Sequence, residues 1–306
     1  RTGSTLQLAL VLVGLCFFGS MVITNDVSLL TFVPFTFVVL SGLAPDTRRA
    51  LTIPVVCMQT IAANLGSMLT PIGNPQNLYL YGKSGMRMAE FLLLMLPYTV
   101  VSLLLLVGWA VAVCRKQASS CIGALPEQPN TTADRKIILL DAVLFAVCLL
   151  AVVRVLPYGV AFAAVLVCTL CADRSTLHNV DYSLLLTFVA FFVFIGNLGR
   201  IPAFSGWLQA ILAGREVLVA VLASQVTSNV PAALLLSGFT DETAALIIGT
   251  NLGGLGTLIA SMASLISYRQ IARELPEEKD RYFKLFTLSN LIFLVILLAE
   301  WRILGR

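Results

Sequence analysis

The chain has 306 residues, of which 58% are hydrophobic and only 12% are charged, and its formal net charge at pH 7 is +4. Soluble domains carry about 25% charged residues, so this composition excludes a soluble protein and predicts a polytopic membrane protein surrounded by the lipid bilayer. Long apolar runs favour membrane helices over the short alternating strands of a β-barrel. The small net charge gives no reason to expect a nucleic-acid partner.

We expect helices in long apolar runs that are separated by polar loops. The runs span residues 5–23, 27–43, 50–69, 88–114, 137–156, 158–172, 182–199, 203–223, 230–239, 243–268 and 285–300. The longest polar loop, residues 115–136, is interpreted as a cytoplasmic linker between a first repeat (1–114) and a second repeat (137–306). The second repeat has more helices before its first motif, so we expect about three N-terminal helices to be missing before Thr5.

Two motifs recur in the same order in both halves. In the first half, TNDVSLL (24–30) precedes NLGSMLTPIGNPQNLYLY (64–81); in the second, SNVPAALLL (228–236) precedes NLGGLGTLIASMASLISY (251–268). Thr24-Asn25 matches Ser228-Asn229, Asn64-Leu65-Gly66 matches Asn251-Leu252-Gly253, and Thr70 matches Thr257. Two ordered matches predict an internal repeat. The placement of lysines and arginines predicts that the two repeats have opposite orientation in the membrane.

The second-half motifs have the lengths of half-spans. Asn229 to Asp241 is about a dozen residues, or roughly 15–18 Å of helix, which is half of a hydrocarbon core of about 30 Å. The chain then returns over a similar length to Asn251, which predicts a re-entrant hairpin that meets a broken helix. The first half is less constrained, because residues 5–23 are long enough to be either a hairpin limb or a full span.

Helix breakers occupy the centre of the first-half motif. Pro71 and Pro75 remove backbone donors, and Gly66 and Gly73 allow the chain to bend and to approach another segment closely. Non-helical backbone at membrane depth must be buried in protein or line a wet cavity. One such cluster is readily explained as a kink or as polar contacts between packed helices. Four clusters in a repeated pattern favour a binding site instead.

The segment TPIGNPQN (70–77) and the paired asparagine motifs resemble the ion transporter superfamily, which includes arsenite permeases, citrate transporters and divalent-anion/sodium symporters. The resemblance covers the chain from Thr5 onward and implies an all-α, inverted-repeat membrane protein with two re-entrant hairpins and two broken helices. It further implies an elevator-type carrier in the plasma membrane of a bacterium or archaeon.

The resemblance also implies where substrate and coupling ion bind. The implied substrate-binding residues are Thr24, Asn25, Asp26, Thr70, Pro71, Gly73, Asn74, Asn77, Ser228, Asn229 and Thr257. The implied coupling-ion residues are Asn25, Asp26, Asn64, Gly66, Asn229, Asn251 and Gly253. The chain departs from the superfamily pattern at Asp26 and Val230, where threonine is usual, and at Leu258, which stands where Pro71 follows Thr70.

The leading hypothesis is a secondary active transporter of a small inorganic or organic anion, such as arsenite, sulfate, citrate or a dicarboxylate. The chain lacks a Walker A motif, so Na⁺, H⁺, the membrane potential or a separate ATPase subunit must supply the energy. A Na⁺/H⁺ antiporter of the same superfamily is the alternative, favoured by the carboxylate of Asp26 at membrane depth. No motif of an intramembrane enzyme or of a metal site is present. A homodimer is compatible with this hypothesis.

Overall fold

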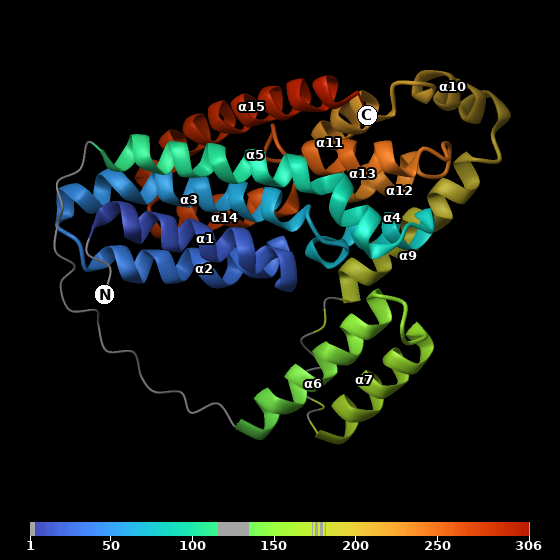
Figure 1. Cartoon of the computed structure of the whole chain (residues 1–306), viewed down its shortest axis with the longest axis horizontal. Coiled ribbons are helices and arrows are strands. Elements are labelled where there is room, and N and C mark those ends of the chain that lie inside the picture. Colours follow the sequence, from blue (N-terminus) through green and yellow to red (C-terminus); the bar gives the residue numbers. More distant parts are fainter. Residues whose placement is uncertain are drawn as a thin grey trace. The chain divides into compact units, whose positions relative to one another are not determined.

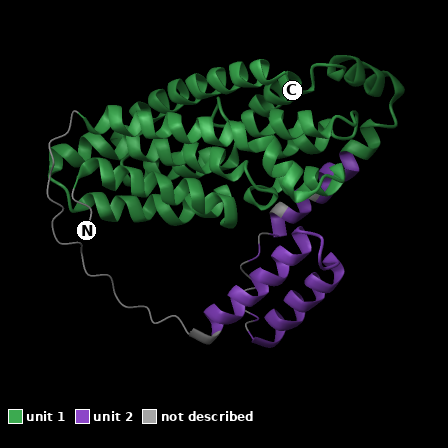
Figure 2. Ribbon diagram, in the orientation of Figure 1, with its two compact units in different colours: residues 1–126, 195–306 green, residues 127–194 purple. Residues whose placement is uncertain are grey.

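The computed structural model describes residues 4–115, 135–172, 174, 177, 180 and 182–305, in which every regular element is a helix (Figure 1). Residues 116–134 of the expected cytoplasmic linker lie outside this part. The described chain forms two compact units, residues 1–126 with 195–306, and residues 127–194 (Figure 2).

The first unit contains the elements that carry both motifs. Its first half comprises α1 (Thr5–Ile23), α2 (Asn25–Ser41), α3 (Pro45–Ser67), η1 (Pro71–Gly73), α4 (Pro75–Ser84) and α5 (Met88–Cys114). Its second half comprises α10 (Pro202–Leu212), α11 (Glu216–Thr227), α12 (Asn229–Leu236), α13 (Thr243–Leu252), α14 (Met262–Glu274), η2 (Pro276–Glu278) and α15 (Lys279–Leu304). Each expected hairpin is therefore two helices joined at one residue, and each expected broken helix is two helices separated by a short irregular segment.

The second unit contains α6 (Arg135–Val152) and α7 (Tyr158–Ala172), which pack against each other, and most of α9 (Tyr182–Leu198). Its apolar side chains point largely outward: Tyr158 is 79% exposed and Leu186 is 69% exposed. Such faces require a partner surface or lipid to cover them.

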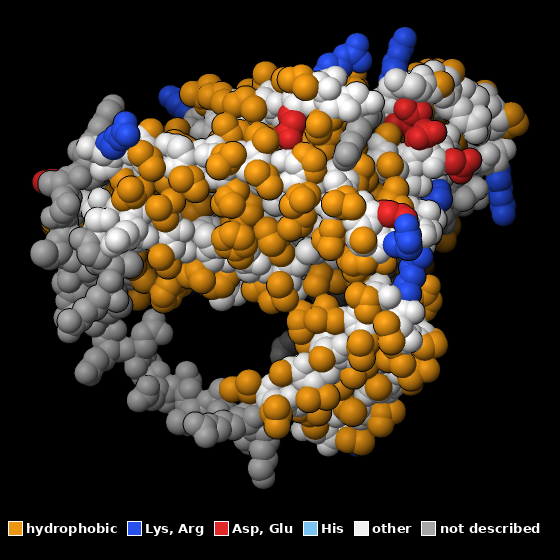
Figure 3. Space-filling view, viewed as in Figure 1, with side chains coloured by type: hydrophobic (Ala, Val, Ile, Leu, Met, Phe, Trp, Pro, Cys, Tyr) orange, Lys and Arg blue, Asp and Glu red, His pale blue; other side chains and the backbone are white. Residues whose placement is uncertain are grey.

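Helix α3 is the centre of the first unit. Of the residues in its most apolar stretch, 94% are buried, and the helix contacts α1, α2, α5, α14 and α15. Helices α1 and α5 and the segment 276–304 are also long and apolar enough to cross a membrane, but no more than 39% of each is buried. Their outward side chains are apolar, and hydrophobic residues cover much of the face drawn in Figure 3. This arrangement, polar contacts inside and apolar side chains outside, is that of a multi-pass membrane protein.

The two hairpins make equivalent contacts with the broken helix of their own half. Helix α1 packs against α3 as α11 packs against α13. Beyond the breaks the contacts cross over: α4 packs against α12 and α13 of the second half, whereas α14 packs against α2 and α3 of the first. The two breaks therefore lie where the halves interlock.

One expected run is interrupted in the structure. Residues 203–223 were expected to be continuous, but α10 ends at Leu212 and α11 begins at Glu216. Gly214 between them has a φ of 74°, in the left-handed region that favours glycine, and its N–H donates to Glu216 Oε1 at 3.1 Å. The chain therefore turns at Gly214, and α11 starts as the first limb of the second hairpin.

Candidate functional site

The two hairpin tips share an unusual backbone conformation. Thr24 has φ 70° and ψ 155°, and Ser228 has φ 74° and ψ 155°. Among the described residues that are not glycine, only these two and Arg154 have positive φ. A residue with a side chain in this region costs roughly 1–3 kcal/mol, and such strain gathers at functional sites. The same strain at two matched positions indicates that both tips have a required geometry.

Each break is anchored to its own hairpin by a matched threonine. Thr70 Oγ1 donates to the carbonyl oxygen of Met21 at 2.5 Å, and Thr257 Oγ1 donates to that of Gln225 at 3.2 Å. Both acceptors lie three residues before a tip. The predicted Thr70 and Thr257 thus hold the breaks next to the tips.

Gln225 satisfies backbone groups that the second break releases. Its Nε2 donates to the carbonyls of Gly253 (3.0 Å) and Leu255 (2.9 Å), and its Oε1 accepts from the N–H of Thr257 (2.9 Å). Buried backbone polar groups must be paired, so this one side chain stabilises an irregular segment that has no helical partner. The sequence prediction did not include Gln225.

Close approach explains two of the predicted glycines. A Cβ on Gly66 would meet the backbone of Phe17 and lie 2.7 Å from Ser20 Oγ, and one on Gly253 would lie 2.7 Å from Ser224 Oγ. Ser20 and Ser224 each lie four residues before a tip. Gly66 and Gly253 therefore let the two broken helices touch the two hairpins at equivalent points.

The first buried asparagine cluster is centred on Asn64. Its Oδ1 accepts from Asn25 Nδ2 (3.2 Å) and from Ser261 Oγ (2.9 Å), and its Nδ2 donates to Ser264 Oγ (3.3 Å). Asn64 is 5% exposed, as is Asn25. Asn64 thus joins the first tip to the break of the opposite half.

The second cluster is centred on Asn251, which is 2% exposed. Its Oδ1 accepts from Asn74 Nδ2 (3.1 Å), and its Nδ2 donates to Asn77 Oδ1 (2.6 Å) and to the carbonyl of Ile247 (2.7 Å). Ser261 and Ser264 occupy the positions in the second motif that Asn74 and Asn77 occupy in the first. Each central asparagine is therefore held by matched residues of the other half, and the two clusters are related like the motifs themselves.

The two tips differ in their remaining contacts. The N–H of Asn229 donates to the carbonyl of Ala260 at 2.9 Å, and Ser228 Oγ donates to the same carbonyl at 3.4 Å. At the first tip the N–H of Asp26 donates to Asn25 Oδ1 at 2.9 Å, while Asp26 Oδ1 is buried with no partner among the described residues. The equivalent of Asp26 is Val230, so this carboxylate makes the site asymmetric.

The structure does not join all the predicted residues directly. Within the described part, no hydrogen bond connects the first tip to the second: Asn25 reaches Asn64, and Asn229 reaches the backbone of Ala260. Gly73 packs tightly against the backbone of Ser67, and Pro71 begins the short η1 turn. These two residues shape the break.

Gln76 is the most informative residue that the sequence prediction missed. Gln76 is 1% exposed, and neither its Nε2 nor its Oε1 has a partner among the residues that the structure describes. An unpaired buried polar group costs roughly 1–3 kcal/mol, and native proteins pair nearly all of them. Its neighbours Asn74 and Asn77 were predicted, so a polar residue between them was a usable signal. Extending the alignment of the two motifs matches Ser261 and Ser264 with Asn74 and Asn77. That match would likewise have indicated that the two serines contact Asn64.

Apolar outer faces around a polar centre, where paired broken helices interlock, define a multi-pass membrane protein built like a transporter. The model of the citrate transporter family, CitMHS, matches residues 1–245, and the chain belongs to this family. This assignment confirms the predicted membership of the ion transporter superfamily, which is a superfamily of membrane transporters.

Relatives with transporter or membrane-protein names agree with this assignment. The chain is 33% identical over 259 residues to the inner membrane protein YbiR of Escherichia coli, covering 81% of this chain and 65% of YbiR. It is 31% identical over 272 residues to the uncharacterized transporter MJ0456 of Methanocaldococcus jannaschii, covering 86% of this chain and 70% of that protein. The uncharacterized transporter Rv2685 of Mycobacterium tuberculosis is 23% identical over 297 residues, covering 85% and 68%. The chain thus spans about two thirds of the length of these relatives.

Proposed function

We propose that the chain carries the substrate site of a secondary active transporter for a small inorganic or organic anion, driven by an ion gradient or the membrane potential. One observation carries the proposal: the two tips share the same strained backbone, and matched contacts around Asn64 and Asn251 join the two helix breaks to each other and to the first tip. Half-helix N-termini and freed backbone groups at such breaks are suited to binding ions without a dedicated charged cage.

The proposal includes an inverted repeat with two re-entrant hairpins. The equivalent positions of α1–α2 and α11–α12 support it, as does the crossover of α4 and α14 onto the opposite halves. In an elevator-type cycle these elements move together as one body, because the clusters around Asn64 and Asn251 tie both breaks and the first hairpin to each other.

The test is transport by the full-length protein in proteoliposomes. Uptake of labelled citrate, succinate, sulfate and arsenite is measured with an inward Na⁺ gradient, an inward H⁺ gradient or neither. We expect gradient-dependent uptake of one of these anions that Asn25→Ala abolishes and Val27→Ala retains, since Val27 is 47% exposed and lies two residues from Asn25. Absence of uptake for all four anions under every gradient would refute the proposal.

A Na⁺/H⁺ antiporter is a second candidate, supported by the buried carboxylate oxygen of Asp26, which has no protein partner among the described residues. A carboxylate at membrane depth is an expected proton or cation site. The same vesicles distinguish the two functions, because an antiporter moves protons in response to a Na⁺ gradient without any added anion.

A further inference from the structure

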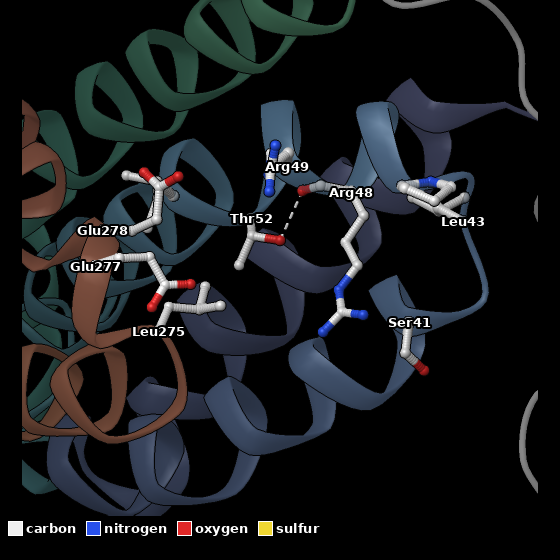
Figure 4. A pocket seen from close by; sticks show the side chains of 10 residues that line it. Ser41, Leu43, Arg48, Arg49, Thr52, Leu275, Glu277 and Glu278 are labelled. Carbon is white, nitrogen blue, oxygen red and sulfur yellow. Dashed lines mark hydrogen bonds between the residues drawn. The ribbon is translucent and has the colours of Figure 1, made fainter.

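A polar cavity lies far from the tips, at the other end of α2 and α3. It has a volume of about 300 Å³ and is lined by the end of α2, the start of α3 and the segment that joins α14 to η2 (Figure 4). Helix α2 has 17 residues, and a helix of this length spans about 25 Å. The cavity is therefore separate from the site around Thr24 and Asn64.

Opposite charges occupy opposite walls of this cavity. Arg48 and Arg49 come from α3, and Glu277 and Glu278 come from η2; in Figure 4 the glutamates lie to the left of Thr52, Arg48 lies to its right and Arg49 lies above it. In the described part of the chain, ion pairs form only between residues close in sequence, and none joins these arginines to these glutamates.

Of the four charged residues that line the cavity, only Glu278 forms an ion pair in the described part of the chain. Glu278 Oε2 already accepts from Arg281 Nη1 at 3.3 Å, so its charge is offset from outside the cavity. Arg48, Arg49 and Glu277 are exposed, and none of them forms an ion pair within the described part of the chain. Leu43, Ile53 and Leu275 add apolar side chains to the lining beside these charges.

These features favour a zwitterionic ligand. A guanidinium group suits a phosphate, which arginine binds with paired hydrogen bonds, and two such groups line the cavity. A plain anion would also face the Glu277 carboxylate, whereas an ammonium group on the same ligand would pair with it. The apolar side chains of the lining accommodate a short hydrocarbon link between the two charges. The volume is at the lower end of the roughly 300–1,000 Å³ typical of small-molecule sites.

We propose that this cavity binds a phosphoethanolamine group, with its phosphate on Arg48 and Arg49 and its ammonium on Glu277. Two sources have this chemistry: the headgroup of phosphatidylethanolamine, and a soluble phosphoethanolamine. Bound there, the group would connect α3 to η2, and thus the first half of the unit to the second.

The experiment uses the full-length protein in two arms. In detergent, calorimetry measures the affinity for O-phosphoethanolamine, inorganic phosphate and ethylammonium. In nanodiscs of phosphatidylglycerol, the unfolding midpoint is measured with and without added phosphatidylethanolamine, with phosphatidylcholine as the lipid control. The variants are Arg48→Gln with Arg49→Gln, and Glu277→Gln. The matched control is Arg273→Gln, because the Arg273 side chain is 86% exposed and lies outside the cavity.

We expect O-phosphoethanolamine to bind at least tenfold more tightly than phosphate or ethylammonium, or phosphatidylethanolamine alone to raise the unfolding midpoint. Binding in the first arm identifies a soluble ligand, and an effect confined to the second identifies the lipid. The double arginine variant should lose at least tenfold in affinity, or the midpoint shift. Glu277→Gln should weaken the zwitterion and strengthen plain phosphate, while Arg273→Gln should change neither. No response in either arm, no preference for the zwitterion, or equal responses in the variants and the control would overturn the proposal.

Discussion

Replacing Gly66 with alanine tests the close contact between the first hairpin and the first broken helix. The new Cβ would meet the backbone of Phe17, which cannot move without moving α1, and would lie 2.7 Å from Ser20 Oγ. Restoring an ordinary contact of about 3.4 Å requires α1 and α3 to separate by roughly 0.7 Å or more. That separation also strains the hydrogen bond from Thr70 Oγ1 to Met21, which is 2.5 Å long.

The expected cost follows from these two effects. Overpacking a well-packed core costs about 1–3 kcal/mol, and a weakened buried hydrogen bond adds roughly 0.5–1.5 kcal/mol. Gly66→Ala should therefore lower the free energy of unfolding by about 2–4 kcal/mol. At roughly 2–4 °C per kcal/mol for a domain of 150–250 residues, the unfolding midpoint should fall by on the order of 5–10 °C.

Gly14 provides the matched control in α1. A Cβ there has nothing within 4 Å, so Gly14→Ala should be neutral or should stabilise the helix by about 0.5–1 kcal/mol. The assay is thermal unfolding of the full-length protein in detergent, followed by intrinsic fluorescence. Gly253→Ala should resemble Gly66→Ala, because its Cβ would lie 2.7 Å from Ser224 Oγ. If Gly66→Ala unfolds at or above the midpoint of Gly14→Ala, the close approach of α1 and α3 is wrong.

Three further predictions concern strain, ligand contact and energy coupling. Thr24→Gly and Ser228→Gly should each raise the unfolding midpoint, because glycine adopts φ near 70° without the roughly 1–3 kcal/mol of strain; a lower midpoint for both would contradict the strain. Gln76→Leu should stabilise the protein by about 1 kcal/mol or more by removing an unpaired buried amide, while raising the KM for the transported anion; an unchanged KM would exclude Gln76 from the substrate site. Asp26→Asn should retain exchange of labelled for unlabelled anion but lose accumulation driven by a proton gradient, and full retention of both in vesicle assays would remove Asp26 from coupling.

Much of the helix pattern was readable from the sequence. The boundaries of α1 agree with the run 5–23, and the interruptions at Thr24, at 68–74, at Ser228 and at 253–261 all fall within the two repeated motifs. The run 203–223 was predicted to be continuous, because one glycine in an apolar run is weak evidence for a break. In the structure the chain turns at Gly214. Local breakers within a repeated pattern are strong signals, whereas an isolated glycine in an apolar run is a weak one.

The pairing within the site was less readable. Asn64 and Asn251 were singled out by their repeated Asn-Leu-Gly motif, but their partners in the other half lie 174–200 residues away in sequence. Ser261 and Ser264 look like ordinary serines in an apolar segment until their alignment with Asn74 and Asn77 is continued. Gln225 precedes the second tip and Gln76 lies inside the first-half motif, but neither residue is repeated in the other half, since Met21 and Ala263 hold the equivalent positions.

By itself, the sequence determined that lipid surrounds this protein and that helix breaks recur in its two halves. Both follow from local properties: the free energy of placing each residue in hydrocarbon, and the backbone limits of proline and glycine. Only the tertiary structure decided that α4 and α14 cross to the opposite halves, so that each central asparagine is held by the other half's break. The same holds for the burial of Gln76 without a partner. Such pairings depend on which helix faces pack together, and many faces of an apolar helix satisfy the same local preferences equally well.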